Sequence, residues 1–256
     1  MQMEGITVES VKKSFGDKVA VRDLTFSVAP GEIQGLLGPN GSGKSTTMKM
    51  ITGIVKPETG KINVYGVDVV KQPVEAKRIV GYVPEFPYLY EYLTASEYLD
   101  FVGTAYHVDF KTRRERVDEL LGALQMNEHV NEIMSGFSQG MRQKIAITAA
   151  LLHKPKALIL DEVLNGLDPR SARIVKDILQ RLAKEGVAII FSTHVLEIAE
   201  AVCGRVTILN EGSLIAEGTV KELRTKAGLP GSTLEDTFLK LTGGEDAEKI
   251  VEALKL

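Results

Sequence analysis

The chain has 256 residues, 44% of them hydrophobic, which is enough for one large α/β domain or two small ones with an ordinary globular core. Its formal net charge is −3, and the basic run at residues 111–114 is more typical of one solvated helix face than of a nucleic-acid footprint, so we expect no nucleic-acid partner. The single cysteine excludes an internal disulfide.

Two stretches near the N-terminus, residues 5–11 and 23–28, alternate apolar and polar side chains as strands do. The Gly16-Asp17 turn lies between them, and Pro30-Gly31 ends the second. They predict an antiparallel β-layer. No basic-then-apolar leader pattern precedes them, because glutamates interrupt it, so we expect the chain to remain in the cytoplasm.

The apolar run 33–37 is followed by a stretch that fits G-x-x-x-x-G-K-[ST]. Its glycines let successive N–H groups converge on one point, and the helix that begins near Lys44 adds the positive end of its dipole. We expect Lys44 to reach the β- and γ-phosphates of a nucleotide and the Ser45 hydroxyl to bind Mg²⁺. The phosphate loop so predicted consists of Gly38, Pro39, Asn40, Gly41, Ser42, Gly43, Lys44, Ser45 and Thr46.

Helical and strand patterns alternate after the phosphate loop. A helix closed by Gly53 is expected at residues 45–54, with strands at 60–66 and 79–83. From about residue 87 to 155 the hydrophobic spacing is helical, which predicts an insert that interrupts the sheet. The helices expected there are 96–106, 113–124 and 140–152.

Strands and helices alternate again in the last hundred residues, as is typical of a parallel sheet. No apolar run approaches the ~20 residues that a bilayer-spanning helix needs. The expected strands are 157–160, 187–191, 205–209 and 212–218, and the expected helices are 172–184, 195–202, 234–241 and 247–256.

Polar residues with catalytic chemistry follow two of these strands. Asp161 and Glu162 come directly after residues 157–160, at a strand end where open α/β sheets present ligand-binding groups. We expect Asp161 to hold Mg²⁺ through its water shell and Glu162 to polarise an attacking water as a general base. His194, which follows residues 187–191, is expected to contact the γ-phosphate and orient that water. The alternative is that these strands simply end in solvated polar residues.

These residues resemble one family, the nucleotide-binding subunits of ABC transporters, over about residues 5–218. Its specific mark is Phe137-Ser138-Gln139-Gly140-Met141, which is similar to the family's LSGGQ signature and lies between the phosphate loop and Asp161. Residues 165–168 resemble the family's D-loop, which ends at Asp168. Phe15 stands where an aromatic residue stacks on adenine, and His194 matches the switch histidine.

The resemblance implies an α/β fold of the ABC type: a P-loop NTPase core with a mostly parallel sheet, an antiparallel β-layer and a helical insert. Residues 1–225 are then one ATPase domain. Its RecA-like core and β-layer take residues 1–86 and 156–225, its helical subdomain takes about 87–155, and residues 226–256 form a short helical tail.

The signature has a physical role of its own, because Ser138 and the N–H groups around Gly140 open a helix and form a second anion cradle. The helical insert separates the two cradles, so we expect them not to meet on one nucleotide within a monomer. The family solution is a head-to-tail dimer with ATP between the subunits. The resemblance then implies that ATP contacts Phe15, the phosphate loop and Asp168, as well as Ser138, Gln139 and Gly140 of a second subunit.

Three departures from the family pattern stand out. Glu85 replaces the usual glutamine, and we expect it to serve with Ser45 and Asp161 as a metal-side ligand. Gln139 replaces the first glycine of the signature, which crowds one backbone approach while adding a side-chain donor. Val163-Leu164 replaces a segment that usually contains proline, which removes a rigid turn but no catalytic group.

The favoured function is an ATPase subunit, with catalytic residues Lys44, Glu162 and His194, that drives a separate membrane permease on the inner face of the cell membrane. The resemblance to efflux-type subunits makes export the expected direction. The alternative is a non-transport ATP-binding regulator with weak or no hydrolysis. The aromatic segment 86–92 either receives the permease or packs the sheet against the helical insert.

Overall fold

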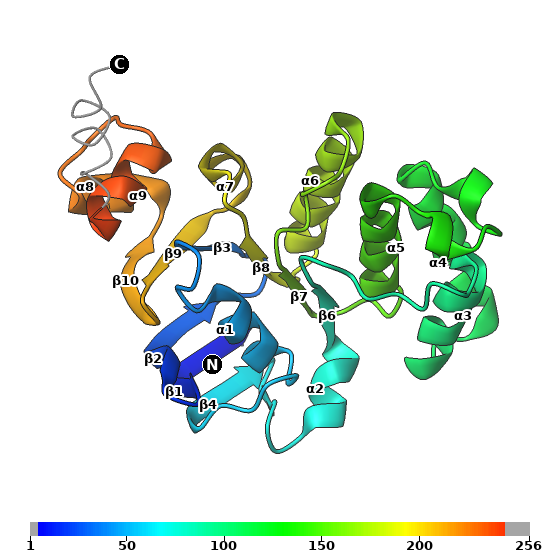
Figure 1. Cartoon of the computed structure of the whole chain (residues 1–256), viewed down its shortest axis with the longest axis horizontal. Helices are drawn as coiled ribbons and strands as arrows, with labels where there is room; N and C mark the ends of the chain where they lie inside the picture. Colours follow the sequence, from blue (N-terminus) through cyan, green and yellow to red (C-terminus); the bar gives the residue numbers. More distant parts are fainter. Residues whose placement is uncertain (1–4, 244–256) are drawn as a thin grey trace.

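The computed structural model describes residues 5–243 and places ten strands in one twisted sheet flanked by helices (Figure 1). The strand order is β5-β4-β1-β2-β10-β9-β3-β8-β7-β6. The helix expected at residues 247–256 lies outside the described residues. The strands are β1 Ile6–Phe15, β2 Lys18–Val28, β3 Ile33–Leu37, β4 Thr59–Val64, β5 Val67–Asp68, β6 Val80–Val83, β7 Ala157–Leu160, β8 Ala188–Ser192, β9 Arg205–Asn210 and β10 Ser213–Gly218.

The helices follow the sequence patterns closely in the middle of the chain. The signals that locate them are hydrophobic spacing and capping residues such as Thr94 and Asp109, whose side chains accept hydrogen bonds from the first turns of α3 and α4. The helices are α1 Lys44–Ile51, α2 Pro73–Ile79, α3 Ala95–Ala105, α4 Phe110–Ala123, α5 Gln139–Leu151, α6 Pro169–Lys184, α7 Leu196–Val202, α8 Val220–Lys226 and α9 Leu234–Thr242, with short 3₁₀ turns η1 Asn127–His129 and η2 Met134–Gly136.

Five neighbouring strands, β9-β3-β8-β7-β6, run parallel, and the rest of the sheet is mostly antiparallel. β1 and β2 form a long hairpin whose turn is at Gly16–Asp17, as expected. β2 of the hairpin joins the rest of the sheet by a short parallel pairing with β10, in which Asp23 lies opposite Ser213 and the Arg22 N–H donates to the Gly212 carbonyl oxygen. The predicted α/β class, with a mostly parallel sheet and an antiparallel layer, is therefore confirmed.

Alternate residues of the buried strands face two different cores, because side chains along a strand point to opposite faces. Leu158 and Leu160 of β7 pack into the core that holds α5, α6 and α7. Ala157 and Ile159 pack on the other face with α1 and the hairpin strands. This double burial explains why β7 reads as an uninterrupted apolar run.

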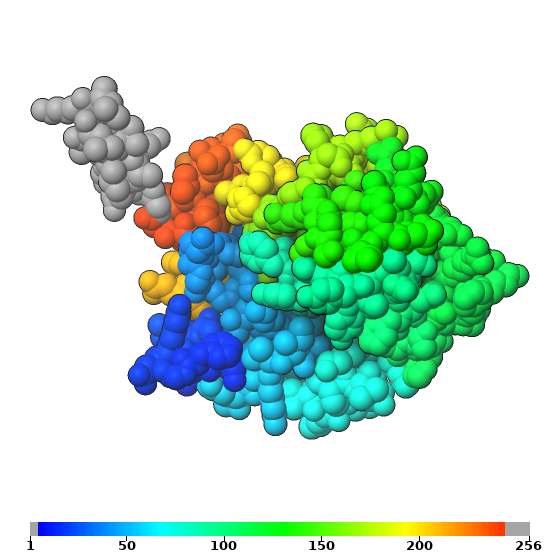
Figure 2. All heavy atoms as spheres, turned by 45° about the vertical axis from the view of Figure 1, so that its right-hand side comes forward, coloured from blue at the N-terminus to red at the C-terminus, as the bar shows by residue number. Residues whose placement is uncertain are grey.

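The helices α3, α4 and α5 lie beyond the edge strand β6 (Figure 1). The helices α8 and α9 lie on the opposite side of the molecule, beside β10. Figure 2 shows α3 to α5, in green, as a lobe next to the blue and cyan N-terminal half. Among residues 5–243, no helix is long and apolar enough to cross a membrane.

The basic run 111–114 is not one solvated face, so that expectation is wrong for Arg113. Its side chain is buried, and its Nε lies 2.8 Å from Asp100 Oδ1 while its guanidinium also donates to the Thr104 hydroxyl. The residue joins α4 to α3 instead of facing water. Spacing alone did not reveal this, because the partner acid lies on another helix.

Candidate functional site

The phosphate loop connects β3 to α1, and two of its glycines are required by close backbone approaches. A Cβ on Gly38 would lie 2.3 Å from the Leu209 carbonyl oxygen, and one on Gly43 would lie 2.6 Å from the Ala20 carbonyl oxygen. Gly43 also has φ of +101°, a conformation that other residues adopt at a cost. The sequence therefore forms this tight turn only with glycine at these positions.

Lys44 is the first residue of α1, and its ammonium lies back over the loop. Its Nζ donates to the carbonyl oxygens of Gly38 at 2.6 Å and Pro39 at 3.2 Å. Burial lowers the pKa of Lys44, whereas the nearby carboxylates of Glu162, Asp161 and Glu85 act in the opposite direction. The loop thus holds one half-buried cation at its mouth, opposite three acids.

The loop fits a phosphate group by its own polar atoms. The Ser42 hydroxyl is buried and has no hydrogen-bond partner among the described residues. Buried hydroxyls are nearly always hydrogen-bonded, so this one indicates a ligand site. The first residues of α1, Lys44, Ser45 and Thr46, line the same pocket at the positive end of the helix dipole. These donors match the charge and the acceptors of phosphate.

The acids expected to bind metal and to act as general base lie just beyond the carboxyl end of β7, and both are buried: Asp161 is 3% exposed and Glu162 is 8% exposed. Ser192, at the end of the neighbouring strand β8, connects them. Its hydroxyl donates to Asp161 Oδ1 at 2.7 Å and accepts from the Glu162 N–H at 3.0 Å. The two carboxylates are therefore held in fixed relative positions by a residue on another strand.

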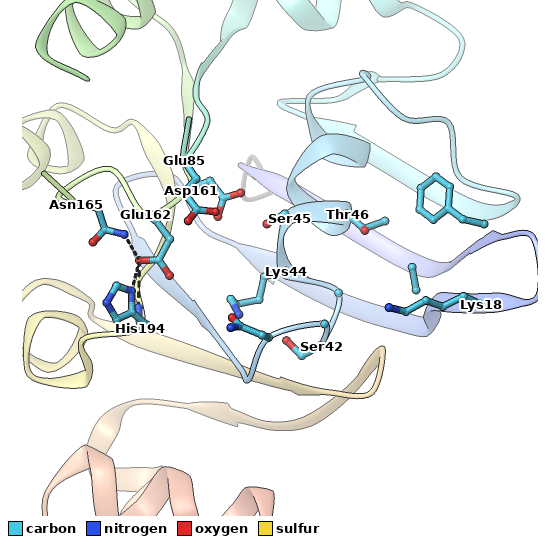
Figure 3. Close-up of a pocket in the computed structure, with 15 residues that line it drawn as sticks. Lys18, Ser42, Lys44, Ser45, Thr46, Glu85, Asp161, Glu162, Asn165 and His194 are labelled. Carbon is cyan, nitrogen blue, oxygen red and sulfur yellow. Dashed lines mark hydrogen bonds and ion pairs between the residues drawn. The ribbon is translucent and has the colours of Figure 1, made fainter. Parts of the chain in front are cut away.

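Glu162 has two further partners through one oxygen, Oε2 (Figure 3). His194 Nδ1 lies 2.9 Å from it, the His194 N–H donates to it at 3.2 Å, and Asn165 Nδ2 donates at 3.4 Å. The sequence analysis expected His194 to contact the γ-phosphate and did not anticipate this direct contact with Glu162. The arrangement leaves Glu162 Oε1 with no hydrogen bond among the described residues.

Glu85 and Ser45 lie close to Asp161 in the same pocket (Figure 3). Burial, with the repulsion of Asp161 and Glu162, raises the pKa of Glu85. Within residues 5–243 there is no cluster of three His, Cys, Asp or Glu side chains placed as metal ligands. A hydroxyl and two carboxylates nevertheless suit Mg²⁺, which uses few protein ligands and completes its shell with water and phosphate oxygens.

The pocket has a volume of about 580 Å³, which is in the range of small-molecule sites. Phe15 forms one wall with a ring that is 53% exposed, and Lys13 Nζ lies 5.2 Å from the ring centre. A partly exposed ring of this kind can stack on a base. The residues that line the pocket are Phe15, Lys18, Ala20, Asn40, Gly41, Ser42, Gly43, Lys44, Ser45, Thr46, Glu85, Asp161, Glu162, Asn165 and His194.

The signature residues do not line this pocket, and neither does Asp168. Ser138 caps α5 by accepting from the Met141 N–H at 3.3 Å, and the helix begins at Gln139, one residue earlier than expected. Gly140 lies against the D-loop, since a Cβ there would be 2.5 Å from the Gly166 carbonyl oxygen. The two cradles are therefore on separate surfaces of one chain.

Asp168 acts within its own chain as a helix cap. Its side chain accepts from the Ser171 N–H and hydroxyl and pairs with Lys144 Nζ at 3.4 Å. The Ser171 bonds and Lys144 lower the pKa of Asp168. The D-loop is thereby tied to α6, and through Lys144 to α5.

The sequence analysis assigned no role to Ser192 or Lys18 and named Asn165 only as part of the D-loop, although all three lie at the site or contact it. A polar residue at the end of an apolar strand was a usable signal for Ser192. Lys18 lies on β2, far from the phosphate loop in sequence, and nothing in its surroundings indicated the pocket.

Comparison with known proteins gives a consistent result. A family model described as "ABC transporter" matches residues 21–165. The chain is 37% identical to the linearmycin resistance ATP-binding protein LnrL of Bacillus subtilis over 98% of this chain and 78% of that protein. It is 34% identical to the ABC-type transporter ATP-binding protein EcsA of the same species, over 96% of this chain and 99% of EcsA.

A solved structure described as the ATP-binding subunit of an ABC transporter superposes with a TM-score of 0.89 at 33% identity. It covers 92% of this chain and 98% of that one.

Proposed function

This chain belongs to the ABC transporter family of ATP-binding proteins, and from that membership we propose that it binds and hydrolyses MgATP as a dimer and drives a separate integral membrane permease. One observation carries the proposal. The phosphate loop, Asp161, Glu162 and His194 meet in one pocket, whereas Ser138 to Gly140 lie outside it. A second subunit that brings its own signature would complete the site.

The proposed chemistry assigns a task to each group in the pocket. The phosphate loop and Lys44 bind the phosphates, and Phe15 stacks on the adenine. Glu162 accepts a proton from the water that attacks the γ-phosphorus, the bond to the bridging oxygen breaks, and ADP and phosphate leave. His194 fixes the Glu162 carboxylate by the 2.9 Å contact described above.

Ser45, Glu85 and Asp161 are the residues that would hold Mg²⁺, which supplies charge neutralisation at the phosphates when it is bound. The signature of the opposite subunit would add Ser138, Gln139 and the Gly140 N–H to the γ-phosphate, and Asp168 would lie at the same junction. Such completion in trans follows the logic of an arginine finger.

The permease is proposed to dock beside the aromatic segment 86–92, which places the chain at the cytoplasmic face of the membrane. Tyr88 is 95% exposed and Tyr92 is 93% exposed, which supports docking. The alternative, that the rings pack the sheet against the helical insert, has support at Tyr90, whose ring packs edge-on against Tyr98 and Phe101 of α3. Exposed aromatic rings are enriched at protein interfaces. We propose that the chain divides into three parts: the core (residues 1–86 and 156–225), the helical subdomain (about 87–155) and the tail (226–256).

Export is the proposed direction. The relatives include proteins described as resistance ATP-binding proteins, for linearmycin and daunorubicin, and a Nod factor export ATP-binding protein. Similarity to such proteins supports an efflux role for this chain.

The test is purification of the affinity-tagged chain from detergent-solubilised membranes, followed by identification of bound integral proteins and assay of MgATP hydrolysis. We expect one polytopic partner in stoichiometric amounts, and hydrolysis that Glu162→Gln abolishes in the same complex. A chain that hydrolyses MgATP but retains no integral partner would fit a non-transport ATPase instead.

A further inference from the structure

A second pocket, here called the rear pocket, lies at the amino ends of β7 and β8. Pro155 and Lys156 come directly before β7, Gly186 and Val187 come directly before β8, and all four line the pocket. Asp161 of the nucleotide site follows the carboxyl end of β7, so the two pockets lie at opposite edges of the parallel strands. The rear pocket has a volume of about 560 Å³, close to the 580 Å³ of the nucleotide pocket, and can hold an organic molecule of similar size.

Apolar side chains from three helices form most of the inner surface of the rear pocket. Leu120 comes from α4 in the helical part of the chain, Leu151 from the end of α5, and Ile178 and Leu182 from successive turns of α6 in the core. Leu151 and Val187 are buried, whereas the other three are half-buried. The pocket therefore offers a hydrocarbon or aromatic body a surface that removes it from water.

The charged side chains around this apolar surface carry an excess of positive charge. The basic ones are Arg116, Lys154, Lys156 and Arg181, and the acidic ones are Glu119 and Glu185. Arg181 Nε lies 3.3 Å from Glu185 Oε1. No acid within residues 5–243 lies within ion-pair distance of Lys154 or Lys156. A complementary occupant therefore has an apolar body and an anionic group.

Two side chains of the pocket wall are fixed by bonds to other segments. The Tyr65 hydroxyl donates to the Gly186 carbonyl oxygen at 2.6 Å, and Lys156 Nζ lies 5.9 Å from the centre of the Tyr65 ring. The Arg116 guanidinium donates to the Leu152 carbonyl oxygen. These bonds form the wall before any ligand enters, so little ordering of the protein opposes binding.

We propose that the rear pocket binds an amphipathic organic anion, whose apolar body packs against Leu120 and Leu182 and whose carboxylate or phosphate pairs with Lys154 and Lys156. An acyl chain and a ring system both provide such a body, and the test below distinguishes them. A molecule bound here touches the helical part and the core at once. The proposal needs neither ATP nor a permease and is independent of the proposed function.

Photolabelling locates the site. The probe is 4-benzoylbenzoate, an aromatic carboxylate whose ketone inserts into neighbouring C–H bonds when it is irradiated. The purified full chain is labelled in the presence of saturating MgADP, and the labelled peptides are identified by mass spectrometry. We expect one label per chain, on the stretches of α4 and α6 that contain Leu120 and Leu182.

Competition identifies the chemistry of the ligand. Dodecanoate carries an acyl chain and 2-naphthoate carries a ring system, so the one that displaces the probe at the lower concentration identifies the preferred body. Acetate has the charge without the body, and 2-naphthol has the body without the charge at neutral pH. We expect neither acetate nor 2-naphthol to displace the probe at the concentrations where the better of the two amphipathic anions does.

Charge variants test the two lysines. The double variant Lys154→Gln with Lys156→Gln should bind the probe about tenfold more weakly, because it loses two solvent-accessible charge contacts. The matched control is Lys184→Gln with Lys221→Gln, which removes the same charge at two exposed positions outside the pocket and should bind as the parent does.

Three results would overturn the inference: labels confined to the nucleotide pocket or scattered over the surface, equal affinity in the Lys154 and Lys156 double variant and the parent, or displacement by acetate or 2-naphthol as effective as by the amphipathic anions. None of them touches the proposed function, since hydrolysis of MgATP and retention of an integral partner are measured separately.

Discussion

Glu162 combines a strained backbone with several partners. Its φ of +51° is uncommon for a residue with a side chain, and such conformations persist only where the surroundings hold them. Here Ser192 holds the N–H while His194 and Asn165 hold Oε2. The result is a carboxylate that is held at Oε2 and has no hydrogen bond at Oε1 within residues 5–243, which suits the general base proposed above.

Glu85 gives the first prediction. Glu85→Ala removes one oxygen donor beside Asp161, so the Mg²⁺ concentration for half-maximal ATP hydrolysis should rise about tenfold. Glu85→Gln keeps an oxygen ligand without the charge, and its half-maximal Mg²⁺ concentration should lie between those of the parent and Glu85→Ala. The measurement is a Mg²⁺ titration of turnover at saturating ATP. An unchanged Mg²⁺ requirement in Glu85→Ala would show that the residue does not bind the metal.

His153 gives a prediction about pH. It stacks on Tyr106 with ring centres 3.8 Å apart, its Nε2 bonds the Val80 carbonyl oxygen at 3.1 Å, and its Nδ1 is buried without a partner among the described residues. Burial, and to a smaller extent Arg116, lowers the pKa of His153 to about 4, although the Val80 bond acts against this.

The sign follows from proton counting. The unfolded chain binds a proton at His153 near pH 6.5 and the folded chain only near pH 4, so the stabilisation is complete above pH 6.5 and is lost as the pH falls through this window. Lowering the pH from 7 to 4.5 should reduce the free energy of unfolding of both proteins, and the reduction should be about 2 kcal/mol smaller in His153→Gln than in the parent. Urea unfolding at both pH values measures this, and equal losses would contradict it.

At the scale of elements, much of the fold was predictable from spacing and glycine. The helices α1, α3, α5 and α6 and the strands β7 to β9 lie within a few residues of their expected positions. The helices α2 and α8 were missed because each buries a single side chain, Ala76 or Leu223, so neither shows an apolar stripe. The capping box of α8, Thr219 with Glu222, was a usable signal.

The site was predictable where its parts are contiguous in sequence and not where they depend on strand pairing. The phosphate loop and the pair Asp161-Glu162 are local motifs. The contact of Ser192 with both acids exists because Leu160 of β7 pairs with Phe191 of β8, so the next residues of the two strands are neighbours. No local sequence pattern predicts which residue of β7 pairs with which residue of β8.

The junction of α5 with the D-loop gives a prediction about elements. Gly140 has no strained φ, so only the 2.5 Å approach to the Gly166 carbonyl oxygen requires a glycine there. Gly140→Ala should therefore push the start of α5 away from the D-loop and lower the unfolding free energy by about 1–3 kcal/mol. Gly136→Ala is the control, since its Cβ would meet nothing within 4 Å. Chemical denaturation of both variants tests this, and equal stability would show that the contact yields freely.

At the scale of the whole molecule, α5 connects two surfaces. Its first residues carry the signature, and Ala146, Ala149 and Ala150 near its other end line a groove of about 310 Å³ that Tyr82 of β6 also lines. A helix of 13 residues spans about 20 Å as one stiff rod. α5 is therefore one continuous helix between that groove and the residues proposed to meet the nucleotide of a second subunit.

The last prediction concerns that two-subunit site. Ser138→Arg places a long cation at the start of α5, where the phosphates of ATP bound to a second subunit are proposed to lie. It also removes a helix cap that contributes about 1 kcal/mol. We expect ATP-driven dimers to disappear while binding of nucleotide to the monomer stays nearly intact, because Ser138 does not line the nucleotide pocket of its own chain. Gel filtration with ATP and a fluorescent-nucleotide titration measure the two quantities.

Two controls make the result specific to the proposed interface. Ser138→Ala removes the cap without adding bulk and separates the loss of helix stability from the block of assembly. Gln180→Arg adds the same charge at an exposed position of α6 and should dimerise as the parent does. Dimers that persist in Ser138→Arg at saturating ATP would mean that the phosphate loop is completed in some other way, since a bulky cation cannot enter a closed interface that buries Ser138.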